Sequence, residues 1–356
     1  MSSNLALYIP SPHAPFSLGH AEIPEPGPHE LVIKNTSVAL NPLDYKIQQS
    51  SAFPVSYPYI AGVSFAGTVE KVGSALQTKF RRLDRVAAGR ISSHSEPGEG
   101  VFQQYVLAHE DAVAKLDETV SLDDASAVIP SIISVVGALH VCMGLSLPDL
   151  NHTHNQNHEK KILVYGGSST LGMRAAEYAM QAGYTVVTTS SPANRAQVSR
   201  FCPQAVAIID HTIPVEEALV KAIVSEGPYD YIFDAIGTPA TTSIVAKAVL
   251  QLNCTSSTTT TTTIWSSRPG GTEDLLGGVQ RRGESYPHFV EEDEGVRRWL
   301  FEEYLPLGLT SKTISVPDIE KVGGGLGSIP GLLDRMRGGG ISGKKLVVDP
   351  WETEQF

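Results

Sequence analysis

The sequence predicts an α/β protein in which a doubly wound parallel sheet is joined to a compact β-barrel. Three observations support this prediction. A strand, a glycine-rich turn, a helix and a second strand follow one another in Lys161–Asn194. After that unit, apolar strands alternate with helical patterns, which is typical of a doubly wound sheet. Before Ser121, short strands are separated by proline and glycine turns, which is typical of a small barrel.

The glycine turn is the most informative element. It ends the apolar strand Lys161–Tyr165 and begins a helix that runs to Gly183. The amides of such a turn and the positive end of the helix suit a pyrophosphate, and small residues let the backbone come close. A strict G-x-G-x-x-G motif is absent, so an ordinary βα loop is the alternative. The residues predicted to bind the cofactor here are Gly166, Gly167, Ser168, Ser169, Thr170 and Leu171.

The end of the next strand, Tyr184–Thr189, indicates which cofactor binds. Enzymes whose cofactor lacks a 2′-phosphate place an acidic residue there, and its carboxylate binds the ribose. This chain has no carboxylate in that stretch before Asp210. Hydroxyl, amide and guanidinium groups stand there instead, and they suit a 2′-phosphate that a carboxylate would repel. The sequence therefore predicts NADPH rather than NADH, bound by Ser190, Ser191, Asn194 and Arg195.

Composition narrows the class of protein. A chain of 356 residues with 41% hydrophobic and 18% charged residues suits a soluble enzyme of two domains. The net charge of -11 argues against nucleic acid or an anionic membrane as the main partner. The three cysteines form no disulfide framework, which fits a reducing compartment. We find no signal peptide and expect no membrane-spanning stretch of about 20 apolar residues, so the prediction is a cytoplasmic protein.

In the first part of the chain we expect the strands of the barrel. A glycine-interrupted run, Tyr59–Val72, has the pattern of a bulged barrel strand. The segment Asn41–Lys46 follows directly on a strand. The other predicted strands are Ala6–Ile9, Leu31–Leu40, Asp84–Ala87 and Val101–Leu107.

Helical patterns follow at Asp123–Val128 and Ser131–Leu145. The polar insertion Leu150–Lys160 contains His152, His154 and His158. These histidines resemble metal ligands in type, but no carboxylate or cysteine pattern accompanies them, and a solvated loop is favoured.

Beyond the glycine unit, a turn with Ile236 comes at the carboxyl end of a predicted strand, where ligands of such sheets bind. The threonine run Thr258–Ile264 is a strand or a low-complexity loop. No clear element is predicted in Arg268–Glu294. The other predicted elements are Ala205–Ile209, Val215–Ser225, Tyr229–Phe233, Thr241–Leu250, Gly295–Leu305, Val316–Lys321, Ile329–Met336 and Lys345–Asp349.

Several blocks together resemble one family. They are a strand followed by NPLD, then AGVSFAGTVEKVG, LDRVA, VFQQYV, YGGSSTLG, FDAIG and the terminal SGKKLVV. In order and spacing they resemble the medium-chain dehydrogenase/reductase superfamily, in its zinc-free quinone and enoyl reductase branch. Within that branch the chain is most similar to fungal oxidoreductases of the ToxD and CipB kind and to trans-acting enoyl reductases of polyketide synthases.

The resemblance implies a GroES-like β-barrel catalytic domain and a Rossmann domain. The expected boundaries are residues 1–130 and 291–356 for the catalytic domain and 131–290 for the NADPH-binding domain. Zinc-dependent members place a cysteine near position 41 and a G-H-E motif later. Here these places read Asn41-Pro42 and Gly62-Val63-Ser64, so no metal is expected. Ser64 also replaces an aspartate that is common in the branch.

The resemblance also implies site residues. The segment after Asn41 would line the nicotinamide, with Pro42, Leu43, Asp44 and Tyr45, and so would the turn at Ser342, Gly343 and Lys344. His211 would lie beside the adenine, with a surface histidine as the alternative. The substrate pocket, or alternatively plain interdomain packing, would use Ile133, Ser134, Val135, Val136, Gly137 and His140.

The chemistry implied is hydride delivery to an enone, an enoyl thioester or a quinone. Lys46 and Tyr45 would stabilise or protonate the developing enolate, and the alternative is that Lys46 only contacts the cofactor while solvent supplies the proton. The predicted function is an NADPH-dependent reductase of fungal secondary metabolism, with a small-molecule substrate and a polyketide synthase as a conceivable partner. Carbonyl reduction, or a non-catalytic NADPH-binding sensor or scaffold, are the alternatives. Monomer and homodimer are both compatible with the sequence.

Overall fold

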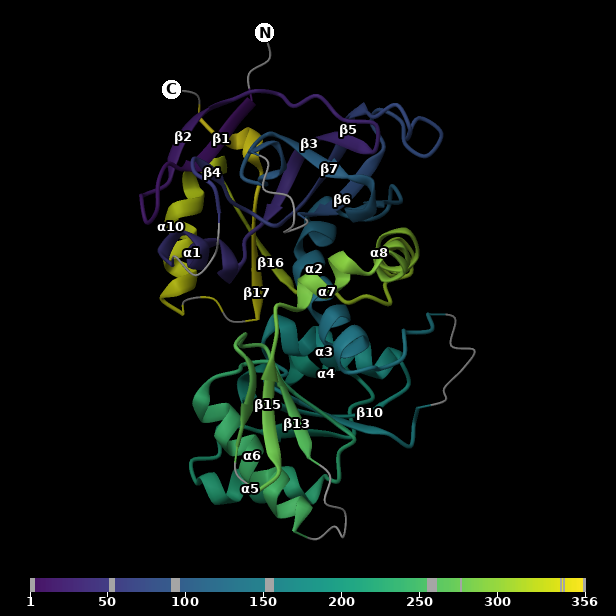
Figure 1. Cartoon of the computed structure of the whole chain (residues 1–356), viewed down its shortest axis with the longest axis vertical. Helices are drawn as coiled ribbons and strands as arrows, with labels where there is room; N and C mark the ends of the chain where they lie inside the picture. The colour runs from purple at the N-terminus through teal and green to yellow at the C-terminus, as the bar shows by residue number, and fades with distance from the viewer. Residues whose placement is uncertain are drawn as a thin grey trace. The chain divides into compact units, whose positions relative to one another are not determined.

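A computed structural model of the chain describes residues 4–50, 55–90, 97–150, 157–254, 261–275, 277–339, 341 and 343–354. The chain forms two compact units. The first contains Met1–Pro130 and Glu291–Phe356, so it is built from both ends of the chain, and the second contains Ser131–Val290. In Figure 1 the purple and blue N-terminal strands and the yellow C-terminal elements lie together in the first unit.

The first unit contains two sheets. One has three strands in the order β2-β1-β4, and the other has seven, with the path β16-β17-β3-β5-β6-β8 and β7 paired to β3. Among the described residues this pairing is an open path, so the predicted barrel is an open one. The strands are β1 (Asn4–Ile9), β2 (Ser17–Ala21), β3 (Glu30–Ala39), β4 (Tyr59–Ile60), β5 (Ser64–Val72), β6 (Arg85–Gly89), β7 (Tyr105–His109), β8 (Val113–Lys115), β16 (Asp318–Val322) and β17 (Lys344–Val348).

Two glycines explain the irregular strand predicted at Tyr59–Val72. Gly62 has a φ of 94° and separates β4 from β5, so the predicted single strand is broken there. Gly67 lies opposite a register shift between Asn35 and Ser37 of β3. A Cβ at Gly67 would lie 2.0 Å from the Lys34 carbonyl oxygen, so only glycine fits this bulge.

The helices of the first unit pack on these sheets. Helix α1 lies beside α10, although the two are far apart in the sequence (Figure 1). Apolar residues of β1, β3, β5, α10 and β17 share one buried core. The helices of this part are α1 (Pro42–Gln49), α8 (Glu294–Arg298), a π-helix at Trp299–Tyr304, α9 (Leu305–Thr310) and α10 (Gly325–Arg337).

Helix α2 (Leu122–Val135) continues directly into a π-helix at Val136–Cys142. The two separate helical segments predicted here are therefore one helix. Leu122–Cys142 is also long and apolar enough to cross a membrane on length and composition alone, which the sequence prediction did not expect. Because 67% of its most apolar stretch is buried inside protein, it has the character of a core helix and gives only weak support for a membrane span.

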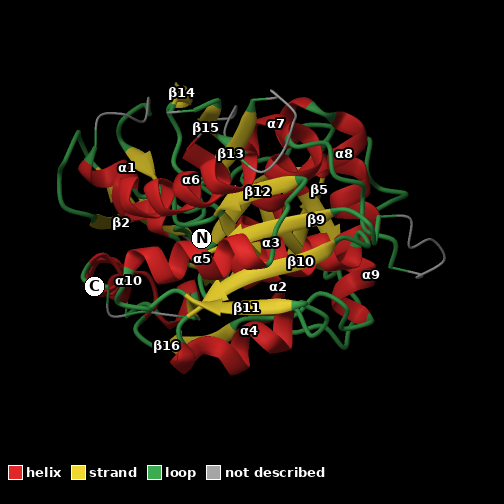
Figure 2. Cartoon of the chain, turned by 90° about the horizontal axis from the view of Figure 1, so that it is seen from below, coloured by secondary structure: helices red, strands yellow, loops and turns green. Residues whose placement is uncertain are grey.

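The second unit has a seven-stranded sheet in the order β11-β10-β9-β12-β13-β15-β14. Figure 2 shows these strands side by side. Every pairing is parallel except that of β14 with β15, so the predicted parallel sheet carries one antiparallel edge. The strands are β9 (Lys161–Tyr165), β10 (Thr185–Ser190), β11 (Ala207–Asp210), β12 (Tyr231–Asp234), β13 (Thr262–Ser266), β14 (Gly271–Asp274) and β15 (Val279–Gly283).

Helices flank this sheet, as alternation predicts. Helix α3 packs on β9 and β10, α5 on β11, and α6 on β12, β13 and β15. A second buried core lies between the strands and α5 and α6. The helices are α3 (Thr170–Gln181), α4 (Arg195–Phe201), α5 (Glu216–Ser225), α6 (Pro239–Asn253) and α7 (Tyr286–Glu292).

The segment Arg268–Glu294, for which no element was predicted, contains β14, β15 and α7. Strand β15 alternates as expected, but the residue at its centre that faces inward is Arg281. Its guanidinium bonds Glu273 at 3.1 Å and the Arg268 carbonyl at 2.8 Å. Because this inward position holds an arginine, the apolar alternation that predicts a strand is interrupted in β15. Of the threonine run, Thr262–Ile264 belong to β13, and residues 255–260 lie outside the described residues.

Candidate functional site

The glycine turn between β9 and α3 is tightly packed. Gly166 has a φ of 88°, and a Cβ there would lie 2.5 Å from Cγ1 of Ile236. A Cβ at Gly167 would lie 2.1 Å from the Thr188 hydroxyl oxygen, and one at Gly172 would lie 2.2 Å from the Gly166 carbonyl oxygen. The turn therefore requires glycine at all three positions. These roles correspond to a sharp turn, a close backbone approach and close helix–strand packing.

The start of α3 leaves hydrogen-bond donors open. The Ser169 hydroxyl accepts the N–H of Gly172 at 3.0 Å and donates to the Gly166 carbonyl at 2.9 Å. Among the described residues, the amides of Ser168, Thr170 and Leu171 have no protein acceptor. Open amides at the positive end of a 12-residue helix suit an anion such as a pyrophosphate.

The turn after β12 borders the glycine turn. The buried carboxylate of Asp234 accepts the amides of Ile236 and Gly237 at 3.1 and 2.9 Å and the hydroxyls of Thr241 and Thr242 at 2.8 and 3.1 Å. With four donors on it, this carboxylate shapes the turn. Ile236 is 40% exposed, and its side chain lies over Gly166.

The carboxyl end of β10 and the turn after it carry hydroxyl, amide and guanidinium groups, and no carboxylate stands there before Asp210. Ser190 is buried, and its hydroxyl donates to the Ser191 carbonyl at 2.9 Å, whereas Ser191 and Asn194 are half-buried. Arg195 is exposed, and one guanidinium nitrogen donates to the Ile208 carbonyl at 2.9 Å, which leaves its other N–H groups for a ligand. The half-buried His211 donates its backbone N–H to the Ser190 carbonyl at 3.2 Å.

Asp210 is the nearest carboxylate in sequence after β10, and it ends the neighbouring strand opposite Ser190. Its carboxylate accepts the amide and the hydroxyl of Thr212 at 2.8 and 2.6 Å. These bonds, with smaller effects from His211 and Arg195, lower the pKa of Asp210. The carboxylate is thus occupied by its own turn, and the position that ends β10 carries a hydroxyl.

The residues predicted to line a substrate pocket differ in exposure. Ile133, Ser134 and His140 are half-buried. His140 donates from Nδ1 to the Leu145 carbonyl at 2.7 Å, which fixes its tautomer. Val135, Val136 and Gly137 are fully buried, and a Cβ at Gly137 would lie 2.1 Å from the Tyr286 carbonyl oxygen. These last three therefore act by packing in this structure.

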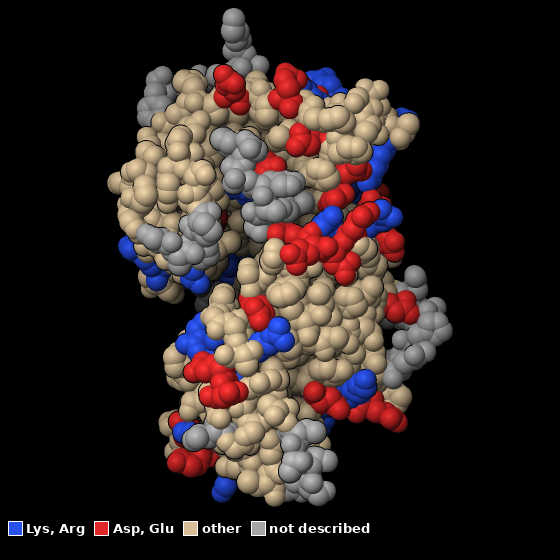
Figure 3. Space-filling model, in the orientation of Figure 1, with Lys and Arg blue, Asp and Glu red and all other residues tan. Residues whose placement is uncertain are grey.

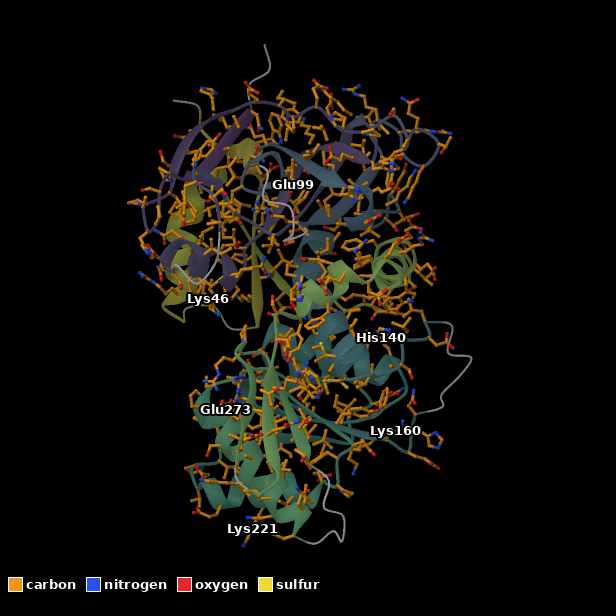
Figure 4. The ribbon with its side chains drawn as sticks, viewed as in Figure 1. Lys46, Glu99, His140, Lys160, Lys221 and Glu273 are labelled. Atoms are coloured by element: carbon orange, nitrogen blue, oxygen red, sulfur yellow. The ribbon has the colours of Figure 1, made fainter. Side chains whose placement is uncertain are left out.

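In the first unit, helix α1 begins directly after β3. Asn41 is its N-cap, and the Asp44 carboxylate accepts the Asn41 backbone N–H at 2.7 Å. Leu43 and Tyr45 pack against the core of the unit, while Pro42 and Lys46 are exposed. Figure 4 labels Lys46, at the surface of α1. Among the described residues, its ammonium makes no hydrogen bond or ion pair.

Asp44, predicted to contact the cofactor, is fully buried, and its carboxylate accepts the Asn41 backbone N–H. Burial raises the pKa of Asp44 to about 7, against smaller lowering effects of the Asn41 amide and of Lys345. Lys345, which the sequence did not single out, is also buried and donates to the side-chain oxygen of Asn41. Burial lowers its pKa to about 8.

The turn predicted near the nicotinamide is described in part. Gly343 has a φ of 66° and is half-buried, and Lys344 is exposed at the start of β17. Ser342 lies outside the described residues, and so do His152 and His154. His158 is exposed. The inward lysine of this strand is Lys345 rather than Lys344.

Within the described ranges, no group of three or more His, Cys, Asp or Glu side chains is arranged to hold a metal ion. The three cysteines are free, and burial raises the pKa of Cys142 to about 11 and that of Cys202 to about 12. On the face shown in Figure 3, acidic and basic side chains are interspersed.

Known proteins with similar sequences belong to a family of enzymes, and solved structures with the same fold are known. Residues 27–118 match the alcohol dehydrogenase GroES-like domain. The trans-enoyl reductase himH of Aspergillus japonicus is 30% identical over 328 residues, which are 91% of this chain and 91% of himH.

Two solved structures share both predicted domains. The quinone oxidoreductase of Pseudomonas syringae pv. Tomato DC3000 superposes with a TM-score of 0.74 at 20% identity, covering 98% of this chain and 100% of that one. Mycobacterial Rv1454c, solved in complex with NADPH, gives a TM-score of 0.71 at 19% identity, covering 98% and 100%. The predicted fold class, a GroES-like domain with a Rossmann domain, is confirmed.

Proposed function

Because the chain belongs to the medium-chain dehydrogenase/reductase superfamily, in its enoyl reductase and quinone oxidoreductase branch, we propose that it is an NADPH-dependent reductase of activated C=C bonds. The family assignment confirms the resemblance predicted from the sequence, and it makes the chain an oxidoreductase that acts on a small molecule with a nicotinamide cofactor. NADPH as that cofactor, an enone or enoyl thioester as the acceptor, and the roles of individual residues are the content of the proposal.

One observation carries the proposal: the start of α3 fits a dinucleotide. The turn has no room for side chains at Gly166, Gly167 and Gly172, and it presents open amides. We assign Ser168, Ser169, Thr170 and Leu171 to the pyrophosphate and Ile236 to the nucleotide beside it.

The end of β10 supports NADPH rather than NADH. Ser191, Asn194 and Arg195 offer hydroxyl, amide and guanidinium groups, with Ser190 behind them, and none of these repels a phosphate. His211 follows β11 and would lie against the adenine. The NADPH bound by mycobacterial Rv1454c, a protein of the same fold, is consistent with this assignment.

When bound, NADPH supplies the hydride. The chain supplies orientation and a place for the negative charge that develops on the acceptor's oxygen. In the first unit, the exposed ammonium of Lys46 is the cation that α1 presents, and Tyr45 is the neighbouring hydroxyl. We propose that Lys46 stabilises this charge and that Tyr45 is a second donor. Pro42, Leu43, Gly343 and Lys344 would border the nicotinamide, and Ile133, Ser134 and His140 the acceptor.

Enoyl thioesters rank above quinones as acceptors because himH, which is 30% identical over 91% of both chains, is a trans-enoyl reductase. By its name, himH acts in trans, and this suggests that the present chain also works on a substrate carried by a polyketide synthase in fungal secondary metabolism. A cytoplasmic location fits such a partner.

The test begins with titration of the purified chain with NADPH and NADH, followed by the nicotinamide absorbance after addition of an enoyl thioester or a quinone. The proposal expects preferential binding of NADPH and its oxidation, faster with the enoyl thioester. Binding without oxidation of either acceptor would favour a sensor or scaffold, and failure to bind both nucleotides would overturn the assignment of the glycine turn.

A further inference from the structure

The buried residues Asn41, Asp44 and Lys345 form a polar cluster in the first unit that no role assigned above explains. Asp44 and Lys345 are among the few ionisable side chains enclosed in this unit, with exposed fractions of 0% and 7%. Taking such groups out of water is unfavourable unless they are paired and hydrogen-bonded. Two apolar side chains of similar volume in place of Asp44 and Lys345 would usually make the fold at least as stable. Stability alone therefore does not explain why charged residues occupy these positions.

The contacts of the cluster join two segments that are remote in sequence. The Lys345 ammonium donates to the side-chain oxygen of Asn41, and the Asn41 side-chain nitrogen donates to the Ala39 carbonyl at 3.0 Å. The Asn41 backbone N–H donates to Asp44 at 2.7 Å, and the Asp44 N–H returns to the Asn41 carbonyl at 3.0 Å. One lysine therefore holds both the end of β3 and the first turn of α1.

The same lysine sits on the strand that pairs with β3. Val347 of β17 lies opposite Ala39, and the Leu40 N–H donates to the Leu346 carbonyl at 3.0 Å. The two segments fixed in this way are Pro42–Lys46 and the turn before Lys345, which are the parts of this unit assigned to the nicotinamide and to the developing charge.

We propose that Lys345 is a positioning residue for the reduction: through Asn41 and Asp44 it sets the orientation of the first turn of α1, which carries Tyr45 and Lys46. The inference rests on the proposed function and adds to it a residue that touches neither cofactor nor acceptor. It also explains why a hydrogen-bonded lysine, rather than an apolar side chain, occupies this buried position.

Other charged and titratable groups act on the cluster. The guanidinium of Arg90, which donates to the Tyr59 hydroxyl at 2.7 Å and to the Ile60 carbonyl at 2.9 Å, attracts Asp44. The Asp44 charge in turn raises the pKa of Tyr59, which burial raises more strongly. These groups come from β4 and from the residue after β6. Among the described residues, no hydrogen bond from these groups replaces the one that Lys345 donates to Asn41.

The experiment compares Lys345→Met with the double variant Asp44→Asn/Lys345→Met. The single variant removes one of the two positive charges that favour the buried Asp44 carboxylate, so it is expected to unfold more easily, and it loses the donor to Asn41. The double variant removes the stranded charge and should recover most of the thermal stability. If Lys345 positions α1, the double variant should still lose about 100-fold in kcat, with its Kd for NADPH changed less than about threefold.

Lys321→Met, with Asp123→Asn/Lys321→Met, is the matched control. Lys321 lies on the neighbouring strand β16 and pairs with Asp123 at 3.1 Å at the surface. These control variants should keep the wild-type kcat. Recovery of the full kcat together with the stability in Asp44→Asn/Lys345→Met would overturn the inference and leave Lys345 a purely structural residue.

A second readout keeps this inference separate from the proposed function. Amide hydrogen exchange in Pro42–Gln49 should speed up in the double variant relative to the wild type while that of β5 and β6 stays unchanged. Unchanged exchange in α1 would overturn the inference even if no acceptor is ever reduced. Faster exchange in α1 of a chain that binds no NADPH would support Lys345 as the residue that holds α1 and would reject only the proposed reaction.

Discussion

Two junctions of this protein, β9–α3 and β3–α1, each join a strand to a helix through a polar capping residue, but the two helix starts differ in whether they can bind an anion. At β9–α3 the cap is a serine, the turn is made of glycines, and the first amides of the helix stay open. At β3–α1 the third helical residue is Asp44, whose own carboxylate occupies the start of the helix. A helix start without a charge of its own can take an anion from solution, and one that carries a buried carboxylate cannot.

The difference extends to how each junction is held. The glycine turn is held by local bonds and by sterics, because every close contact of Gly167 and Gly172 lies within the βαβ unit. The α1 junction is held by Lys345, 304 residues away from Asn41 along the chain. The first arrangement can therefore be recognised in a short window of sequence, and the second exists only once β17 has paired with β3.

The largest expected effect is the change of the unfolding free energy with pH that Asp44 and Lys345 cause. The pKa of Asp44 is raised from 3.8 to about 7, so the stability given by its proton is present below 3.8 and lost as the pH rises to about 7. The pKa of Lys345 is lowered from 10.5 to about 8, so its contribution is present above 10.5 and lost as the pH falls to about 8. The pair therefore contributes least between these two values, near neutral pH.

Urea unfolding of the wild type and of Asp44→Asn/Lys345→Met between pH 3.8 and 10.5 measures how the unfolding free energy depends on pH. Relative to the double variant, the wild type should lose roughly 4 kcal/mol of unfolding free energy on the acidic side as the pH rises to neutral, and regain stability at alkaline pH. The control Asp123→Asn/Lys321→Met should follow the wild-type profile. Parallel profiles for the wild type and the Asp44 double variant would show that the cluster does not titrate as its burial implies.

Gly172→Ala should give the next largest effect, at the other junction. Its Cβ would lie 2.2 Å from the Gly166 carbonyl oxygen, so α3 has to move away from the turn. We expect a loss of about 3 kcal/mol in unfolding free energy and a loss of at least about tenfold in NADPH affinity, measured by fluorescence titration.

Gly331→Ala is the control for this change, because a Cβ at that position of α10 meets nothing within 4 Å. The control should be neutral or stabilise by about 0.5–1 kcal/mol. Equal stability and NADPH affinity in Gly172→Ala and the wild type would contradict the close packing of the turn.

The contrast between the junctions also explains what the sequence could reveal. The strand β9, its turn and α3 follow from a local pattern, and so do the serines that end β10. Strand β15 was missed because its inward position is Arg281, which is acceptable there only through Glu273 and the Arg268 carbonyl. Both partners are close in sequence, and Glu273 lies directly opposite Arg281 in the β14–β15 pairing, but a search for alternating apolar residues does not recognise a buried arginine.

Lys345 was missed for a related reason. The terminal Lys-Lys pair was assigned to the site through Lys344, which the structure shows to be exposed, whereas its neighbour faces inward. Alternation along a strand makes one of two adjacent lysines face the core, but only the position of the strand tells which one. One residue in the sequence could have suggested a buried lysine: Asp44 is a carboxylate in a segment that was expected to face the cofactor.

Ser191→Asp tests the lack of a carboxylate at the end of β10, with a smaller expected effect. A carboxylate at the end of β10 would repel a 2′-phosphate and bind a free ribose hydroxyl. Like charges about 4 Å apart repel by roughly 1 to 4 kcal/mol, so NADPH affinity should fall at least about fivefold while NADH affinity holds or rises. Ser191→Asn, which has the same shape without the charge, should keep the preference for NADPH; a preference unchanged in Ser191→Asp would move the 2′-phosphate away from Ser191.

Lys46→Met should have the smallest effect and tests what the α1 junction presents. Its ammonium is exposed, and in water a cation about 4 Å from a unit negative charge stabilises it by roughly 1 kcal/mol. We therefore expect kcat for the enoyl thioester to fall about fivefold, with NADPH affinity nearly unchanged, and Tyr45→Phe to lower it less. Lys221→Met, in α5 of the second unit, is the exposed-lysine control and should keep the wild-type kcat (Figure 4).

A fall in the kcat of Lys46→Met beyond about 100-fold, together with loss of one limb of the pH profile, would make Lys46 a general acid instead. An equal fall in NADPH affinity would make it a cofactor contact, and the charge on the acceptor would then be left to Tyr45 and solvent.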